Sequence, residues 1–483
     1  MVIAAATTVG CLAAAVLAAH WWIHRRVPPV AKGTVAFFHP FADGGGGGER
    51  VLWAAVQALQ MQRPDVRVAV YCGGTVDARE LCKHVLERFN LSVQPTFTVV
   101  PLPNRDALLP GRYPRFTMLA QAAASVAVAW QGLRQLVPEL WIDTTGWAFQ
   151  YPLTRLAGAR VAAYVHYPTI STDMLQRVWE RNAGYTNSDD VAASPLKSLA
   201  KLAYYHAMAL LYGCVGAFAQ VVMVNSSWTR RHIAALWWQW RRPQRVYPPC
   251  DTRALQALPL DRRLKRIYIV SVAQFRPEKD HALQLRALAA ARDKAAARHD
   301  SVGDAVLGAR LRLIGSCRNA EDEARIAELA ALAEHLGIGE QVEFVVNASF
   351  DKLRALLGDA VAGLHTMVDE HFGISVVEYM AAGVVPIAHD SGGPRKDIVL
   401  PEPAAEGAPS QPTGYRCTSL AQYADAIIEV VGMEQVDRLR VAGAARRRAA
   451  QFSDQRFQKE FLACLVDVLP LGRDSEPPRN LLQ

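Results

Sequence analysis

Two glutamates mark the segment with the clearest potential for chemistry. Glu370 opens the string EHFGISVVE and Glu378 closes it. We place Glu370 on a loop after a strand, and Glu378 inside a helix that opens near Ser375 and stops at Gly383. Ionised carboxylates accept hydrogen bonds from hydroxyls, and the N–H groups of a first helical turn hold phosphate. The spacing predicts a sugar–diphosphate ligand between two carboxylates; the ordinary alternative is a capped helix start with a solvated Glu378.

Three other segments place polar or flexible residues beside strand ends. Five glycines at 44–48 would let the backbone approach phosphate or sugar, although the lysine of a P-loop and the GxGxxG spacing are both missing. Arg276 and Lys279 follow a strand closely and could neutralise a diphosphate leaving group. His166 ends another strand and could touch the reacting sugar. The ordinary alternatives are a linker, a solvated charged turn and a structural histidine.

Alternating apolar strands and helices must position these residues. Strands covered by helices on both faces form parallel sheets, and ligands bind beyond the carboxyl ends of such strands. The sequence therefore predicts an α/β protein with two doubly wound, Rossmann-like halves that face a cleft. The expected strands are 33–38, 66–71, 97–100, 140–143, 161–166 and 221–224 in the first half, then 267–273, 309–315, 342–346, 360–366 and 384–389 in the second.

The expected domain boundaries follow from these two series. An N-terminal domain spans 33–255, and a C-terminal domain spans 265–445. The seam between them lies near 251–266. A last helical segment, 446–470, is expected to pack back on the N-terminal domain.

The N-terminus predicts a membrane anchor. Residues 1–23 carry no charged side chain apart from a titratable histidine, and Arg25 and Arg26 follow them at once. About 20 apolar residues cross a bilayer, and basic residues mark its cytosolic side. We therefore expect a transmembrane helix with the catalytic part in the cytosol. A cleaved signal peptide is the alternative, but its charges would precede the apolar stretch.

Two further segments could meet a membrane or a lipid. Residues 202–224 contain no Lys, Arg, Asp or Glu, which fits either a buried core helix or a helix in or on a membrane. Trp237, Trp238 and Trp240 stand beside several arginines, and they could contact lipid or simply pack in the core.

The overall composition excludes several functions. The net charge of +8 suits anionic small molecules or a membrane surface and is too weak to indicate nucleic acid. The eight cysteines form no CxxC pair, so they predict neither a zinc site nor a disulfide framework. No DxD-type cluster stands near the expected cleft, so we expect no metal requirement and no resident cofactor.

Several strings together resemble the family 4 retaining glycosyltransferases of the GT-B fold, and specifically the eukaryotic GDP-mannose-dependent alpha-1,2-mannosyltransferases of the dolichol pathway. The glutamate pair is shared by the whole superfamily, whereas the strings around 165–171, 224–229 and 273–281 are more specific. The strings that carry the resemblance are GGGGGERVLW, VHYPTIS, VNSSWT, VYPPCD, AQFRPEKDH and EHFGISVVEYMAAG.

The resemblance implies an activity and its partners. It implies transfer of the fourth and fifth mannoses from GDP-mannose to a dolichol-diphosphate-linked oligosaccharide, at the cytosolic side of the endoplasmic reticulum membrane. Other dolichol-pathway mannosyltransferases are implied as partners. The donor and the product are both alpha-linked, so the reaction should be retaining, with same-face attack by the acceptor hydroxyl. Two rival hypotheses are a GT-B transferase with another donor, such as UDP-N-acetylglucosamine, and a non-catalytic membrane scaffold of the same fold.

The resemblance also implies roles for individual residues. Glu378 would hold the ribose, Glu370 the donor mannose, and His166 would lie near the transferred sugar. The residues implied to bind the donor nucleotide sugar are Gly46, Gly47, Arg276, Lys279, Glu370, Phe372, Gly373, Ile374 and Glu378. In many relatives an arginine stands five residues before the lysine; that position here is Gln274, and Arg276 is the candidate to replace it.

Overall fold

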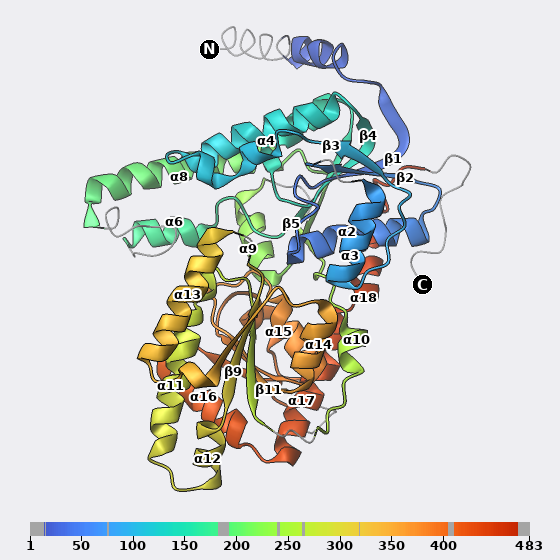
Figure 1. Cartoon of the computed structure of the whole chain (residues 1–483). Coiled ribbons are helices and arrows are strands. Elements are labelled where there is room, and N and C mark those ends of the chain that lie inside the picture. Colours follow the sequence, from blue (N-terminus) through green and yellow to red (C-terminus); the bar gives the residue numbers. More distant parts are fainter. Residues whose placement is uncertain are drawn as a thin grey trace.

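The computed structural model describes residues 14, 16–74, 77–181, 193–238, 242–262, 266–317, 319–403 and 410–471. Its strands form two parallel sheets, one in each half of the molecule, and helices cover both faces of each sheet (Figure 1). This confirms the two Rossmann-like halves that the alternation of strands and helices predicts.

The first sheet has the order β3-β2-β1-β4-β5-β6-β7. The chain order reverses between β1 and β4, and ligands of doubly wound sheets bind beyond the strand ends at such a reversal. The strands are β1 (Val30–Phe38), β2 (Arg67–Cys72), β3 (Thr98–Pro101), β4 (Val137–Asp143), β5 (Arg160–Val165), β6 (Val221–Val224) and β7 (Gln244–Arg245).

The second sheet has the order β10-β9-β8-β11-β12-β13, with its reversal between β8 and β11. Its strands are β8 (Tyr268–Val272), β9 (Arg310–Gly315), β10 (Val342–Val346), β11 (Ala360–His365), β12 (Val385–His389) and β13 (Tyr415–Cys417). The short edge strands β7 and β13 are absent from the expected set.

Helices connect the strands in both halves. Those before the seam are α2 (Gly47–Gln62), α3 (Ala78–Phe89), α4 (Thr117–Leu133), α5 (Tyr151–Leu156), α6 (Thr172–Trp179), α8 (Pro195–Gly216) and α9 (Ser227–Leu236). Those after it are α10 (Thr252–Gln256), α11 (His281–Ala296), α12 (Ser301–Leu307), α13 (Ala320–His335), α14 (Phe350–Gly358), α15 (Ile374–Ala382), α16 (Leu420–Gly432), α17 (Gln435–Ala449) and α18 (Asp454–Leu465).

The chain crosses between the halves twice, and the two crossings lie side by side. Cys250 pairs with Ser453 in an isolated parallel bridge, and Cys250 N donates to Phe452 O at 3.0 Å. Beyond this point α18 returns to the first half and buries Phe457 and Phe461 in its core beside α2 (Figure 1). The return begins later than the expected boundary at 446, because α17 still packs on α15 of the second half.

The N-terminal segment lies against the first half. Residues 16–24 are helical, and Trp22 stacks on Trp130 of α4 with ring centroids 5.3 Å apart. Ile23 is buried in the same core. Residues 1–13 of the expected anchor lie outside the described residues. In the part of the chain that the structure describes, no helix is long and apolar enough to span a bilayer.

The uncharged segment 202–224 forms most of α8 and all of β6. One face of α8 packs on the first half through Tyr205, Met208 and Tyr212, while Leu210 and Leu211 are exposed. The helical part of the segment is therefore not a fully buried core helix. It is a surface helix whose outer face is also apolar.

The tryptophan group divides between the core and the surface. Trp237 is 2% exposed, and its ring contacts Tyr151 and Tyr212, with centroids 6.0 and 5.3 Å away. Trp238, by contrast, is 59% exposed. Trp240 lies outside the described residues. Core packing is thus the role of Trp237, and of the two described tryptophans Trp238 remains a candidate for lipid contact.

Candidate active site

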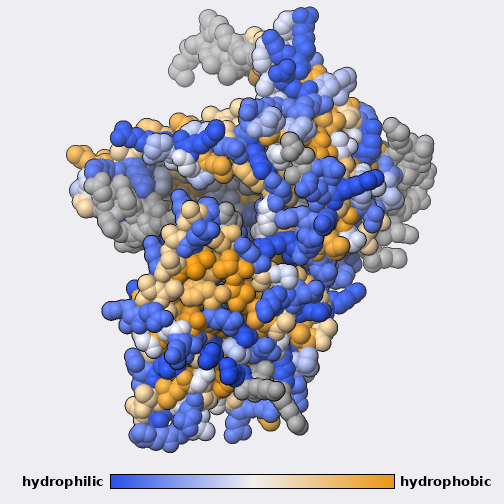
Figure 2. Space-filling model, in the orientation of Figure 1, coloured by the Kyte–Doolittle hydropathy of each residue, from blue (hydrophilic) through white to orange (hydrophobic). Residues whose placement is uncertain are grey.

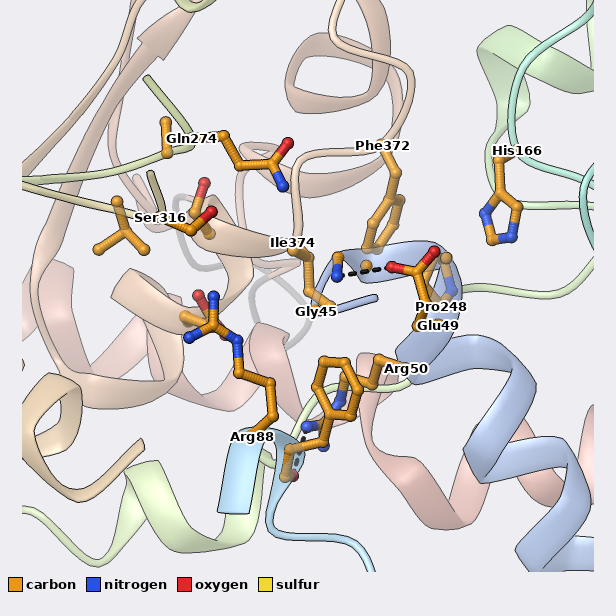
Figure 3. Close-up of a pocket in the computed structure, with 18 of the residues that line it drawn as sticks. Gly45, Glu49, Arg50, Arg88, His166, Pro248, Gln274, Ser316, Phe372 and Ile374 are labelled. Atoms are coloured by element: carbon orange, nitrogen blue, oxygen red, sulfur yellow. Dashed lines mark hydrogen bonds between the residues drawn. The ribbon is translucent and has the colours of Figure 1, made fainter. Parts of the chain in front are cut away.

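A cleft of about 560 Å³ lies between the two halves, beyond the carboxyl ends of β1 and β8 (Figure 3). Nine of the ten predicted site residues line it: Gly46, Gly47, His166, Lys279, Glu370, Phe372, Gly373, Ile374 and Glu378. The structure thus brings together residues from loops that are far apart in the sequence.

Glu370 and Lys279 form an ion pair at the wall of the cleft. Lys279 Nζ donates to Glu370 Oε2, and His365 Nε2 lies 3.1 Å from the same oxygen. Burial alone would raise the pKa of Glu370, but Lys279 and His365 outweigh it and hold that pKa well below its usual range. The turn that carries Lys279 is held in place by Thr366, whose hydroxyl donates to Lys279 O at 2.8 Å.

Glycines fix the backbone around Glu370. Gly373 has a φ of +104° and Gly392 a φ of +53°, both in the left-handed region that favours glycine. A Cβ atom on Gly392 would lie 2.1 Å from Glu370 O. The next residue, Gly393, donates its N–H to that carbonyl at 2.7 Å. The chain can therefore hold Glu370 at this position only with glycine at 392.

The first turn of α15 faces the cleft without a side-chain cap. Uncapped N–H groups at a helix start carry partial positive charge and bind phosphate. In the same helix, Glu378 has no hydrogen-bond partner among the described residues, and burial raises its pKa to about 7 even though Arg50 opposes the shift. A buried carboxyl group without partners is suited to accept hydrogen bonds from ligand hydroxyls.

The glycine loop is clamped from behind by Glu49. Its Oε2 accepts a hydrogen bond from Gly46 N at 2.6 Å, and its Oε1 lies 3.1 Å from His39 Nε2. His39 Nδ1 in turn lies 2.8 Å from Thr144 Oγ1. Burial opposes ionisation, but His39 and the Gly46 N–H together lower the pKa of Glu49. The loop is thus ordered, with its backbone presented toward α15.

His166 follows β5 and faces the glycine loop. Burial, followed in size by the neighbouring His39, lowers the pKa of His166 to about 4, so the ring is neutral at pH 7. Its Nε2 is buried without a hydrogen-bond partner in the described chain. A Cβ atom on Gly48 would lie 3.6 Å from this nitrogen. The ring is therefore placed to hydrogen-bond a hydroxyl of a ligand held at the loop.

Arg276 is the predicted residue that the structure does not bring to the cleft. Its N–H donates to Gln274 O at 2.8 Å, and this tight bend turns the side chain toward Glu278, with Nη1 and Oε1 3.7 Å apart. Gln274 lines the cleft instead. The position at which many relatives have an arginine thus faces the cleft here with an uncharged amide.

The sequence did not point to two arginines of the cleft lining, Arg50 and Arg88. Arg50 of α2 is buried, donates to Pro249 O and Phe89 O, and pairs with Asp454 at 3.1 Å. The signal available for Arg50 was its position directly after Glu49 at the start of a helix. No local pattern marks Arg88, which comes from α3.

Hydrogen bonds to Asp397 and ring contacts of His371 connect the two halves. The buried carboxylate of Asp397, in the second half, accepts hydrogen bonds from Ser227 N at 2.8 Å and from Ser227 Oγ at 2.6 Å. Tyr247 OH donates to the same carboxylate at 2.9 Å. His371 stacks on Tyr167 of the first half, with ring centroids 4.1 Å apart. These contacts set the separation of the two cleft walls.

Comparisons with known proteins cover both halves. The family model described as "ALG11 mannosyltransferase N-terminus" matches residues 32–237, and "Glycosyl transferases group 1" matches residues 258–437. Similar curated relatives are named GDP-Man:Man(3)GlcNAc(2)-PP-Dol alpha-1,2-mannosyltransferase. The Mus musculus protein is 43% identical, over 93% of this chain and 91% of its own length. The Dictyostelium discoideum protein is 37% identical, over 90% and 85%.

Solved structures share the fold at low sequence identity. Anabaena HepE in complex with UDP-glucose is 16% identical and has a TM-score of 0.57, over 90% of this chain and 99% of its own. Sucrose-phosphate synthase from Thermosynechococcus elongatus is 16% identical with a TM-score of 0.61, over 90% and 98%. The two sheets and the cleft between them are thus those of GT-B glycosyltransferases, and the chain belongs to the ALG11 mannosyltransferase family.

Proposed function

We propose that this enzyme transfers mannose from GDP-mannose to the dolichol-diphosphate-linked trimannosyl-chitobiose oligosaccharide, forming alpha-1,2 linkages with retention. The observation that carries the proposal is the Lys279–Glu370 pair, which faces the glycine loop across the cleft. The family supports this choice, because the similar relatives are named for this donor and this acceptor.

The donor would lie along the cleft with its mannose near His166 and Glu370. Its diphosphate would lie between the glycine loop and the first turn of α15, and its ribose would meet Glu378. Cleavage of the mannose–phosphate bond develops negative charge on the diphosphate and positive charge on the sugar ring. Lys279 and the α15 N–H groups stabilise the negative charge on the diphosphate. The ionised Glu370 lies on the side of the positively charged sugar ring.

The acceptor hydroxyl would approach the same face of the mannose that the diphosphate leaves. The bond from the hydroxyl oxygen to the sugar would form as the mannose–phosphate bond breaks, with the hydroxyl proton passing to the departing diphosphate, so the alpha configuration is retained without a covalent intermediate on the enzyme. His166 is uncharged at pH 7, so it would act as a hydrogen-bond partner of a sugar hydroxyl and not as an acid. In this proposal Lys279 and the N–H groups of α15 supply the positive charge that faces the diphosphate. GDP-mannose is a substrate and not a cofactor.

Donor binding should weaken in acid because of Glu378. Its pKa near 7 in the free enzyme means that the carboxyl gains a proton as the pH falls below 7, and a carboxylic acid accepts ribose hydrogen bonds less well. We expect the Kd for GDP-mannose to rise by up to about tenfold per pH unit below 7, the limit for one linked proton. Titration calorimetry between pH 5.5 and 8 would measure this.

The matched variant for this prediction is Glu378→Gln. The amide is isosteric and does not titrate, so its Kd should be higher at pH 8 and nearly independent of pH. A variant that keeps the wild-type slope would show that another group is responsible. Stability should respond in the opposite sense: a raised pKa lets the folded state hold a proton that the unfolded state has lost, so Glu378 disfavours folding as pH rises from about 4.5 to 7.

We propose that the first half docks on the cytosolic face of the endoplasmic reticulum membrane, beside the N-terminal anchor. The exposed side chains of α8 recur at helical spacing and are mainly apolar. They are Leu196, Leu199, Leu210, Leu211 and Phe218, the last just beyond the helix end. Figure 2 shows apolar side chains at the outer end of α8, and Figure 1 shows that α8 and the N-terminal helix both lie on the first half, away from the second.

Charge on the outer face of α8 should impair docking and acceptor use. Leu210 is 56% exposed, so Leu210→Glu leaves the core intact while it opposes insertion between lipids. Burying a leucine contributes about 1.5–3 kcal/mol, so vesicle binding should weaken roughly tenfold or more. The apparent KM for the lipid acceptor should rise, and that for GDP-mannose should stay unchanged. Flotation with anionic vesicles and steady-state kinetics would test this.

The control for this surface is Val436→Glu in the second half, at a side chain that is 76% exposed. It should leave vesicle binding unchanged. Trp238→Ser should act like Leu210→Glu, whereas Trp237→Ser should unfold the first half because Trp237 is buried. Equal loss of binding in Leu210→Glu and Val436→Glu, or a rise in the KM for GDP-mannose alone, would contradict the docking surface.

Transfer itself is the test of the proposed function. The full chain in detergent or vesicles is given radiolabelled GDP-mannose and the trimannosyl-chitobiose acceptor on dolichol diphosphate. Label should pass to the lipid. Label in the lipid from UDP-N-acetylglucosamine instead would support the rival donor. Failure to transfer from either nucleotide sugar, with intact donor binding, would support the scaffold hypothesis.

A further inference from the structure

Arg88 lines the cleft but has no part in the reaction described so far. It stands in the last turn of α3, is half-buried, and has no hydrogen-bond or ion-pair partner within the described ranges. Figure 3 shows its guanidinium group reaching from α3 toward the side of the cleft that holds Ser316. An arginine directed into a ligand cleft without a partner is available to bind the ligand.

The glycine loop shows which part of the donor Arg88 would meet. Three glycines of the loop each approach a different side chain of the cleft lining, and these side chains give a direction along the cleft. The ideal Cβ of Gly48 is 3.6 Å from His166, that of Gly47 is 4.0 Å from Ile374, and that of Gly45 is 2.8 Å from Arg88 Nε. With the sugar at His166 and the diphosphate at the start of α15, Arg88 lies at the nucleoside end.

The other residues at this end form a site suited to a flat polar ring. α3 lies against α14, whose Phe350 and Leu353 also line the cleft and supply apolar surface. Gln274 and Ser316 line it from the ends of β8 and β9, and neither side chain has a hydrogen-bond partner in the part of the chain that is described. Stacking surface, neutral polar groups and one cation thus converge there.

We propose that Arg88 determines base specificity by donating two hydrogen bonds to O6 and N7 of guanine. This rests on the proposed GDP-mannose donor. The guanidinium group offers only donors, in a fixed fork, and guanine presents two adjacent acceptors on that edge. Adenine replaces O6 with an amino group, which is itself a donor and cannot pair with the fork. Uracil has no second acceptor in this arrangement.

Binding of free nucleotides to the full chain tests the proposal. The probes are GDP, inosine diphosphate, which keeps O6 and N7 but lacks the 2-amino group, and ADP. Wild type should bind the first two more tightly than ADP. In Arg88→Met, the Kd for GDP and for inosine diphosphate should each rise about 10- to 100-fold. The Kd for ADP should change less than about threefold.

The control is Lys83→Met, which removes a positive charge from an exposed position of the same helix, outside the cleft lining. It should change none of the three affinities, and both variants should keep the thermal unfolding temperature of wild type. If Arg88→Met weakens the binding of GDP and ADP equally, the guanidinium group contacts the diphosphate, and the proposal is wrong. Unchanged GDP binding would overturn it too. Equal affinity of the wild-type enzyme for GDP and ADP would instead contradict GDP-mannose as the donor.

Discussion

Replacing Lys279 with alanine should abolish most turnover while the protein remains folded. Loss of one preorganised group that stabilises developing charge lowers the rate by about 10²–10³-fold. Lys279 is the cation paired with Glu370 at the cleft wall, so its loss also frees that carboxylate to move. The loss of turnover should exceed the loss of stability, because His365 Nε2, 3.1 Å from Glu370 Oε2, still partners the buried carboxylate. Turnover at saturating GDP-mannose and thermal unfolding would measure the two effects.

Lys294→Ala is the matched control for this change. Lys294 forms an ion pair with Asp425 at 2.6 Å, but on the surface of the second half. Exposed pairs contribute about 0–1 kcal/mol, so turnover and stability should stay near wild type. Near-normal turnover in Lys279→Ala, or a protein that no longer folds, would contradict the role of Lys279 in transfer.

Replacing Asp397 with alanine should disturb both stability and turnover. The change leaves Ser227 and Tyr247 without their acceptor in a buried region between the halves. Each neutral donor left unsatisfied costs about 1–3 kcal/mol, and Arg245, which also pairs with Asp397 but is 38% exposed, adds less. The cleft walls would also lose their fixed separation, and a misplacement of about 1 Å can cost about 10²-fold in rate. Chemical denaturation and initial-rate kinetics on the same preparation would test both effects.

Asp425→Ala serves as the control here, because the Asp425 side chain is 64% exposed and pairs only at the surface. Its stability and turnover should match wild type. If Asp397→Ala keeps full activity and stability, the carboxylate does not set the geometry of the cleft. If Asp397→Ala lowers stability but leaves turnover intact, the contact stabilises the fold and does not set the geometry of the cleft.

Much of the fold follows from local patterns. Most strands of the two sheets follow from a mainly apolar run that a polar loop ends, as Val66–Tyr71 and Val221–Val224 illustrate. The alternation of these runs with helices predicts both sheets. The edge strands were missed because they are very short. Gln244–Arg245 has only two residues, both exposed, and so lacks the apolar run that identifies a buried strand.

Residues in motifs at strand ends could be expected near the cleft, because the carboxyl ends of parallel strands share one edge of a sheet. Lys279 and Glu370 are of this kind. Arg276 shows the limit of the argument. Gln274 and not Arg276 lines the cleft at the bend Gln274–Arg276, and no residue pattern marks that bend.

Side-chain contacts between the halves could not be predicted, although the return of the last helix to the first half was expected. Arg88 belongs to the far end of a helix, and only the packing of α3 against α14 brings it to the nucleoside end of the cleft. The same is true of Asp397, which reaches α9 across the seam. Such contacts depend on how two separately folded sheets dock, and nothing in the local sequence encodes that arrangement.

The most direct test of the central claim is the structure of the lipid-linked product. The enzyme would be incubated with GDP-mannose and the trimannosyl-chitobiose acceptor, and the released glycan would be analysed by mass spectrometry before and after alpha-1,2-mannosidase digestion. We expect two added hexoses that the mannosidase removes in wild type, and none in Lys279→Ala. A product that resists the mannosidase, or no product from GDP-mannose with the wild-type enzyme, would contradict the proposed function.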